Sequence, residues 1–181
     1  FYTSKQELEV KTIELIHGTF KNLRSAEGAF DLLQNFKNIA TLDNISRELQ
    51  KQYTEVLNQY KNELTKNREL FESGRNNLLV SKNKPPIAGS ISWARAIYYR
   101  IKRPILKFKQ KEKNLEAPDL FANIKKEYLE VANMIYTYQK EKFSEWSDKI
   151  RERAMNYLKD YILRKEPDGR YEVNFSEDFK T

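Results

Sequence analysis

Apolar residues recur at intervals of three and four along most of the chain, which is the pattern of amphipathic helices that bury one face. The first such stretch spans residues 4–23, and its apolar positions are Leu8, Ile13, Ile16, Phe20 and Leu23. Ser25 is a good N-cap for a second, short helix, whose buried face consists of Ala26, Ala29, Phe30, Leu33 and Phe36. Asp43 or Asn44 can cap a third helix that reaches to about residue 79. Its stripe consists of Ile45, Leu49, Tyr53, Val56, Tyr60, Leu64 and Phe71.

Prolines separate these three helices from the C-terminal half of the chain. Pro85 and Pro86 end the third helix, because each removes an amide donor and forces its predecessor out of the helical region. A fourth helix is predicted from about Ala88, with Trp93 and Tyr98 beside a stripe of Ile91, Ala94, Ile97, Ile101, Ile105 and Phe108. Pro104 falls inside this pattern and predicts a kink or a break.

A fifth and longest helix is predicted to begin at Pro118 and to reach about residue 163. Its stripe consists of Leu120, Ile124, Tyr128, Val131, Ile135, Tyr138, Trp146, Ile150, Tyr157 and Tyr161. The phase of this stripe slips between Tyr138 and Trp146, which indicates a bend or a change of packing partner. Beyond this helix, Asp168-Gly169 predicts a turn, and residues 171–175 alternate as a short strand or an extended arm would.

These elements predict an all-α fold, an elongated antiparallel bundle of about five helices with a short C-terminal strand. Five glycines and five prolines among 181 residues are too few for a turn-rich all-β domain. We divide the chain at the paired prolines. Residues 1–83 hold the first helices and the long rod, and residues 84–181 hold the corner, the kinked basic helix, the long helix and the C-terminal arm. The chain begins at Phe1 rather than Met, so we expect an internal stretch of a longer polypeptide.

The sequence carries few residues that could perform chemistry. Cysteine is absent, which excludes disulfides and Cys-ligated zinc and is typical of a reducing compartment. The glycines are scattered, so neither a P-loop nor a dinucleotide fingerprint is present, and no run of about 18 apolar residues exists. His17 is the single histidine, and beside an apolar helix face we interpret it as a packed or half-exposed core residue. We expect no catalytic residue, cofactor or metal in this segment, and no enzyme activity of its own.

Positive charge is concentrated in one stretch. The whole chain carries +7, whereas residues 82–113 alone hold ten Lys or Arg and one Glu. The candidate partner-binding residues there are Arg100, Lys102, Arg103, Lys107 and Lys109. Three interpretations stay open, namely a solvated basic face, a contact for an acidic protein partner, or a site for nucleic acid or an anionic membrane. The cations are scattered around the helix, and no nucleic-acid motif accompanies them.

One motif points to a family. Residues 81–95 read Ser-Lys-Asn-Lys-Pro-Pro-Ile-Ala-Gly-Ser-Ile-Ser-Trp-Ala-Arg, and Arg100-Ile101-x-x-Pro104 follows. This string resembles the N-terminal tail region of dynein heavy chains, in which Asn-x-Pro-Pro-hydrophobic-Ala-Gly precedes Trp-Ala-Arg. Ser25-Ala26-Glu27 with the downstream Leu32-Leu33-x-x-Phe36 is similar to the axonemal members. Val173-Asn174-Phe175 resembles the family's closing Val-Asn-Phe, although Ser176 stands where Asp is common.

By that resemblance, the whole protein would be a microtubule motor that uses ATP in cilia or flagella. Its ATPase ring and microtubule-binding stalk would lie C-terminal of this segment. The segment would be a tail bundle in the axoneme, a cytoskeletal structure of the cytoplasm, and would help to hold a second heavy chain, intermediate chains and light chains. The basic stretch is the expected contact for one of these partners. The alternative is a basic helical module that binds nucleic acid or anionic membrane, whose binding would fall steeply with salt.

The same motif has a physical role that does not depend on the family. Pro85 and Pro86 break one rod, Gly89 permits close packing, and Trp93 can wedge into the joint. Arg95 can hydrogen-bond carbonyls that the break leaves open. We interpret these five residues as a rigid corner between helices, with a docking patch as the alternative.

Overall fold

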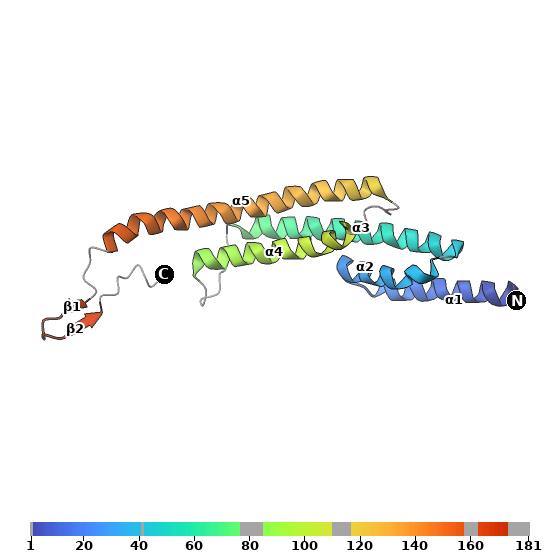
Figure 1. Ribbon diagram of the computed structural model, residues 1–181, viewed down its shortest axis with the longest axis horizontal. Coiled ribbons are helices and arrows are strands. Elements are labelled where there is room, and N and C mark those ends of the chain that lie inside the picture. Colours follow the sequence, from blue (N-terminus) through green and yellow to red (C-terminus); the bar gives the residue numbers. More distant parts are fainter. Residues whose placement is uncertain (1, 41, 77–84, 110–116, 158–162, 174–181) are drawn as a thin grey trace.

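Five α-helices make up most of the residues that the computed structural model describes, which are 2–40, 42–76, 85–109, 117–157 and 163–173. The helices are α1 (Tyr2–Lys21), α2 (Ala26–Asn35), α3 (Asp43–Gly74), α4 (Pro86–Lys109) and α5 (Pro118–Tyr157). A short 3-10 helix, Phe36–Ile39, follows α2, and two strands, β1 (Leu163–Lys165) and β2 (Tyr171–Val173), follow α5. In Figure 1, α3, α4 and α5 lie alongside one another, while α1 and α2 lie beside the N-terminal half of α3. The prediction of an elongated all-α bundle is confirmed.

The helix starts show which capping predictions hold. The Ser25 side chain accepts a hydrogen bond from the Gly28 amide at 3.2 Å, so this predicted N-cap is confirmed. The predicted cap of α3 is wrong, because Leu42 occupies the N-cap position and Asp43 is already the first helical residue. A carboxylate in the first turn still favours the helix start through the helix dipole.

The two long helices end earlier than the sequence predicts. Helix α3 ends at Gly74 rather than near residue 79, and residues 77–79 lie outside the described residues. Helix α5 is described as far as Tyr157, residues 158–162 lie outside the described residues, and Leu163, where the helix is predicted to end, instead begins strand β1. Periodicity overestimates both lengths because an apolar residue at helical spacing can also belong to the segment that follows the helix.

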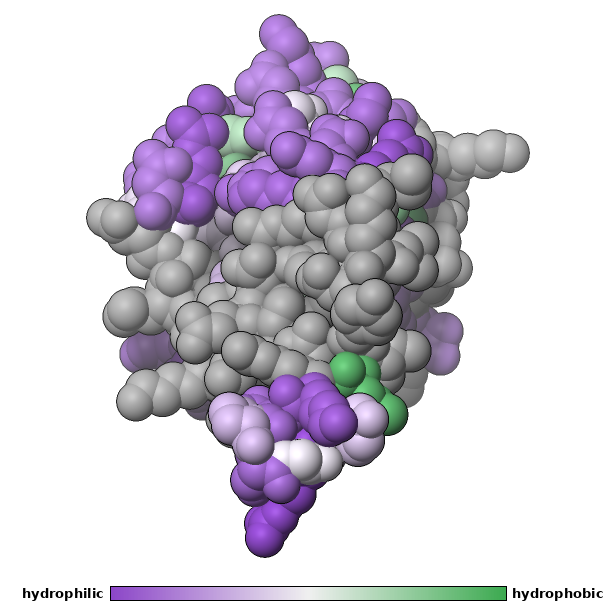
Figure 2. Space-filling view, turned by 90° about the vertical axis from the view of Figure 1, so that its left-hand side faces the viewer, coloured by the Kyte–Doolittle hydropathy of each residue, from purple (hydrophilic) through white to green (hydrophobic). Residues whose placement is uncertain are grey.

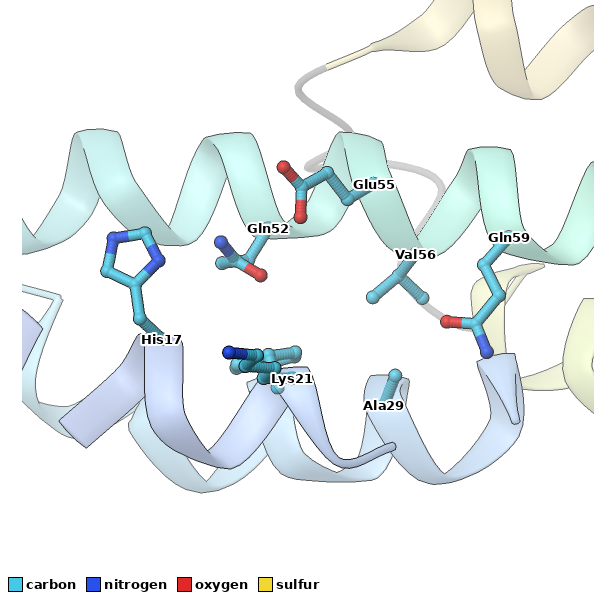
Figure 3. A pocket seen from close by; sticks show the side chains of 8 residues that line it. His17, Lys21, Ala29, Gln52, Glu55, Val56 and Gln59 are labelled. Atoms are coloured by element: carbon cyan, nitrogen blue, oxygen red, sulfur yellow. The ribbon is translucent and has the colours of Figure 1, made fainter. Parts of the chain in front are cut away.

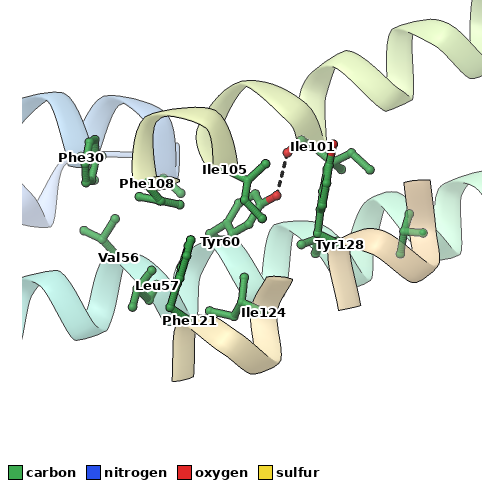
Figure 4. Close-up of a cluster of buried hydrophobic side chains, with 14 of the residues drawn as sticks. Phe30, Val56, Leu57, Tyr60, Ile101, Ile105, Phe108, Phe121, Ile124 and Tyr128 are labelled. Atoms are coloured by element: carbon green, nitrogen blue, oxygen red, sulfur yellow. Dashed lines mark hydrogen bonds between the residues drawn. The ribbon is translucent and has the colours of Figure 1, made fainter. Parts of the chain in front are cut away.

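The core is centred on Phe108, whose ring touches aromatic rings from three other helices. Its centroid lies 4.8 Å from that of Phe30 in α2, 5.4 Å from that of Tyr60 in α3 and 6.4 Å from that of Phe121 in α5. All three contacts are edge-to-face, the arrangement that the charge distribution of aromatic rings favours. Figure 4 shows this cluster, in which α2, α3, α4 and α5 meet.

Pro104 lies within α4, which runs without a break from Pro86 to Lys109. Of the predicted kink or break at Pro104, the break is therefore wrong. A proline in a helix interior removes one backbone donor and disturbs the carbonyls one turn earlier. The Tyr60 hydroxyl donates a hydrogen bond of 2.6 Å to one of these carbonyls, that of Ile101 (Figure 4). This bond ties α4 to α3 beside Pro104, while the carbonyl that loses its helical donor to the proline is that of Arg100.

We expect Tyr60→Phe to lower the free energy of unfolding by about 1–2 kcal/mol, because it leaves the buried Ile101 carbonyl without this donor. Burial raises the pKa of Tyr60 far above its usual value, so the hydroxyl remains a donor at neutral pH. Urea denaturation of both proteins measures the effect. Tyr53→Phe, on the same helix, is a comparison that leaves the Ile101 bond intact. An unchanged midpoint in the Tyr60 variant would show that this hydrogen bond contributes little to the stability of the bundle.

Among the stripe residues whose burial the structure describes, which exclude Tyr157, three are exposed. Leu8 is 65% exposed, and Trp146 and Ile150 are 45% and 46% exposed. Figure 1 gives the reason, since the N-terminal end of α1 extends past the start of α3 and the C-terminal part of α5 extends past the ends of α3 and α4. Tyr161, predicted on the same stripe of α5, lies outside the described residues.

The predicted C-terminal strand is confirmed for Tyr171–Val173, whereas residues 174 and 175 lie outside the described residues. Strand β2 pairs antiparallel with β1, and Leu163 is opposite Val173. The predicted turn at Asp168-Gly169 connects them, and Gly169 has a φ of 87° that favours glycine.

Candidate functional site

The predicted corner begins at the start of α4. The Pro85 carbonyl accepts a hydrogen bond from the Gly89 amide at 2.7 Å, and Pro86 is the first helical residue, where a missing amide hydrogen costs nothing. Helix α4 therefore starts two residues earlier than expected. Gly89 is buried in the first turn, as close packing requires. Residues 81–84 of the motif lie outside the described residues.

Trp93 packs between α3 and α5. Its ring stacks on Phe71 with centroids 5.5 Å apart and planes 14° apart, and it meets Tyr138 edge-on at 6.3 Å. Gly74, the last residue of α3, lies directly against the ring, because an added Cβ there would come within 2.6 Å of the Trp93 ring. The sequence did not indicate Phe71, Gly74 or Tyr138 as neighbours of Trp93. Gly74 was the available signal, since a glycine near a helix end often permits a close approach.

The carbonyls that Arg95 is predicted to bond belong to the break before α4, of which residues 77–84 lie outside the described residues. Arg95 is exposed, and among the described residues it donates no hydrogen bond to a carbonyl at a helix end. It lines a groove between α4 and α5 with a volume of about 390 Å³. The other lining residues of this α4–α5 groove are Tyr98, Tyr99, Tyr128, Leu129, Ala132, Asn133, Tyr136 and Gln139. Burial, followed by a hydrogen bond with Tyr98, raises the pKa of Tyr128 to about 12. The Tyr128 hydroxyl is therefore neutral at physiological pH.

The basic residues of α4 form two rows. Arg100, Arg103 and Lys107 are three and four residues apart and share one side of the helix. Lys102 and Lys109 are seven residues apart and share another side with Arg95, which lines the α4–α5 groove. The buried stripe that contains Ile101 and Ile105 lies between the two rows. Arg100, Arg103 and Lys109 are exposed, whereas Lys102 lies over the ring of Tyr98 at 5.2 Å.

Lys107 makes contacts within the bundle that set it apart from the other candidates. Its ammonium group lies 2.5 Å from Asp31 and 3.1 Å from Glu27, both on α2. The hydrogen bond to Asp31 raises the pKa of Lys107, and Glu27 acts in the same direction. These pairs join the C-terminal end of α4 to α2, so Lys107 contributes to internal packing and less to a free basic surface.

A second, polar pocket of about 320 Å³ lies between α1, α2 and α3. Figure 3 shows its side chains, which include His17 and Lys21 from α1 and Gln52, Glu55 and Gln59 from α3. His17 is half-exposed, and its Nε2 lies 3.2 Å from the nearly buried carboxylate of Glu48. Gln52 donates to the same carboxylate oxygen at 3.1 Å.

His17 and Gln52, which line the polar pocket, contact the nearly buried carboxylate of Glu48. The pocket itself has few groups that could take part in catalysis. The lining contains no hydroxyl or thiol nucleophile for His17 to activate. Among the described residues, no group of three or more His, Cys, Asp or Glu could hold a metal ion. Within the same residues, no helix has the length and apolar character needed to cross a membrane.

The end of the bundle next to the hairpin offers no broad apolar surface among the residues coloured in Figure 2. Most of these side chains are hydrophilic, and the hydrophobic ones form only small spots.

Comparison with known families gives one match that covers the bundle. Residues 1–181 match the model of the family described as "Dynein heavy chain, N-terminal region 1". The resemblance that the Pro-Pro motif suggested thus extends along the whole chain.

Individual relatives agree with the family model. The chain is 34% identical over 180 residues to the dynein-1-alpha heavy chain of the flagellar inner arm I1 complex of Chlamydomonas reinhardtii. It is 25% identical over 178 residues to the flagellar outer arm dynein gamma chain of the same organism, and 27% identical over 175 residues to human dynein axonemal heavy chain 8. These alignments cover 97–98% of this chain but 4% of each relative, so the chain corresponds to a small part of their length.

Proposed function

The chain belongs to the dynein heavy chain family, whose N-terminal region 1 it matches along its whole length, and from this premise we propose that it is a non-catalytic scaffold segment of a dynein tail. In this role it helps to hold a second heavy chain, intermediate chains and light chains within a motor complex of the cilium or flagellum axoneme. Movement along microtubules, driven by ATP, belongs to parts of the heavy chain outside this segment. The segment itself requires no cofactor.

The observation that carries the proposal is that the match to an N-terminal tail region spans every helix of the bundle. A scaffold that transmits force needs helices that cannot slide past one another. The aromatic contacts of Phe108 and Trp93 meet this need at two places along the rod, because each joins α4 to both α3 and α5.

The free cations of α4 are the proposed contact for an acidic partner subunit. Arg100 and Arg103 are exposed on one side of the helix, and Lys102 is partly exposed on another. Nucleic acid is supported less well, because a helix that follows a phosphate backbone presents its cations on one face, whereas α4 has a row on each side of its buried stripe.

We expect the triple variant Arg100→Glu, Lys102→Glu, Arg103→Glu to keep its helical fold and to retain less dynein heavy, intermediate or light chain. The reason is that reversal of three charges replaces attraction to an acidic surface with repulsion. The measurement is a pull-down from nuclease-treated axonemal extract at moderate salt, with mass spectrometry of the retained subunits. Circular dichroism checks the fold.

A matched control reverses three exposed lysines on other helices, with the substitutions Lys11→Glu, Lys66→Glu and Lys126→Glu. It changes the net charge equally, so loss of partners only in the α4 variant assigns the contact to α4. Equal retention by both variants would argue against a docking role for these residues. Binding that appears only without nuclease, and is lost between low and moderate salt, would instead indicate a nucleic-acid site.

A further inference from the structure

A row of exposed apolar side chains runs along α5. Its members, here called the α5 seam, are Leu129, Tyr136, Phe143, Trp146 and Ile150, and each is 45–65% exposed. The seam starts in the α4–α5 groove, which Leu129 and Tyr136 line. It continues along the part of α5 that extends past α3 and α4 in Figure 1.

Most of the α5 seam lies beside the face that α5 buries in the bundle, and only Trp146 lies in line with that face. The buried face contains Tyr128, Val131, Ile135 and Tyr138, and no residue from 139 to 152 is buried. The residue that would continue this face by a four-residue step from Tyr138 is Lys142. Phe143, seven residues after Tyr136, lies beside this face, whereas Trp146, five helical turns after Tyr128, lies on the same side as the buried face and is exposed because no helix covers this part of α5.

The spacing of the α5 seam is that of a helix-binding surface. Leu129, Tyr136, Phe143 and Ile150 are each seven residues apart, and Trp146 lies three residues after Phe143. One apolar position of the heptad repeat is thus filled throughout, whereas the other holds Ala132, Gln139 and Trp146. The 22 residues from 129 to 150 span about 32 Å, so the partner is a helix of at least about three heptads.

Between residues 140 and 152 of α5, lysines lie beside the α5 seam and acids lie opposite it, and Arg151 is the one charged residue that fits neither group. Lys140, Lys142 and Lys149 occupy the heptad positions beside the seam. The acids Glu141, Glu145, Asp148 and Glu152 all occupy the two heptad positions opposite it. Glu145 pairs with Lys142 at 3.1 Å and with Lys149 at 2.7 Å, but exposed pairs of this kind contribute little and can exchange partners.

We infer that the α5 seam binds an amphipathic helix of a separate polypeptide, in which apolar heptad positions are flanked by Asp or Glu. The apolar positions would cover Phe143, Trp146 and Ile150, and the acids would meet the three flanking lysines. A second copy of this chain fits less well, because an antiparallel pair would bring Lys142 and Lys149 of the two copies together. The inference concerns α5 and does not depend on the scaffold role proposed for α4.

The test uses the full 181-residue chain and two fluorescent helical peptides of about four heptads. Both peptides have the same leucines at the apolar positions, and the flanking positions are all Glu in one and all Lys in the other. Like charges keep each peptide from pairing with itself. We expect fluorescence anisotropy to show that the Glu-flanked peptide binds at least about tenfold more tightly than the Lys-flanked peptide.

Two variants and a control localise the binding. Lys140→Glu, Lys142→Glu, Lys149→Glu should invert the preference between the peptides, and Phe143→Ser, Trp146→Ser should weaken the binding of the Glu-flanked peptide by at least about tenfold. Leu8→Ser removes a comparably exposed apolar side chain from α1 and should leave binding unchanged. All substituted side chains of α5 lie beyond its buried face, so circular dichroism melting should show an intact bundle for each variant.

Other outcomes would overturn the inference. Equal affinity for the two peptides, or no binding of either at about 100 μM, would exclude an acidic-flanked helix as the occupant. Sedimentation that shows a dimer of the chain, lost in the Phe143→Ser, Trp146→Ser variant, would assign the α5 seam to a second copy instead.

Discussion

Replacement of Phe108 by alanine is expected to lower the free energy of unfolding by about 3–5 kcal/mol. The Phe108 side chain is fully buried, and its ring touches those of Phe30, Tyr60 and Phe121. Truncation removes the apolar surface that the ring buries and leaves a cavity where four helices meet. The surrounding rings cannot collapse into this space without moving a helix, so most of the cavity should remain. Denaturation with urea, followed by circular dichroism, measures the change.

Leu106→Ala provides the matched control on the same helix. Leu106 is 46% exposed and lies two residues from Phe108, so its removal should change the free energy of unfolding by at most about 0.5 kcal/mol. If both variants lose similar stability, the loss does not depend on the aromatic cluster, because Leu106 lies outside it. A small effect of the Phe108 variant alone would mean that the four helices do not depend on this junction.

Helical periodicity predicts the elements of this fold well because most helices bury one face against a neighbour. The five helices, the Ser25 cap and the turn at Asp168-Gly169 follow from local patterns. Periodicity does not reveal whether a neighbour is present, and Trp146 is exposed for this reason although it lies on an apolar stripe. It also does not reveal that a distant hydroxyl, that of Tyr60, bonds a carbonyl beside Pro104.

The candidate site is predicted only in part. The motif that identifies the family also places Trp93 at a helix junction, and the structure supplies its neighbours Phe71 and Tyr138. Charge counting gives the basic residues of α4 equal weight, yet Lys107 pairs with two acids of α2. This difference depends on which helices are adjacent, and a net charge along the chain contains no such information.

The second large effect is expected at the predicted corner, where Trp93→Ala should lower the free energy of unfolding by about 3 kcal/mol. The ring is partly buried, which favours the lower end of the range for tryptophan truncation. The ring stacks on Phe71 and meets Tyr138 edge-on, so its loss removes one aromatic contact between α4 and α3 and one between α4 and α5. The space beside Gly74 would stay empty, since glycine has no side chain to fill it.

Trp146→Ala separates this effect from a general effect of tryptophan removal. Trp146 is 45% exposed on the distal part of α5, and its truncation should change stability by at most about 0.5 kcal/mol. With about 2–4 °C of melting temperature per kcal/mol for a chain of this size, the Trp93 variant should melt roughly 6–12 °C lower and the Trp146 variant almost unchanged. An unchanged melting temperature for the Trp93 variant would refute the corner, because a side chain that holds three helices together cannot be removed without cost. Loss of stability in the Trp93 variant alone would instead support the proposal that Trp93 holds α3, α4 and α5 together as a rigid rod.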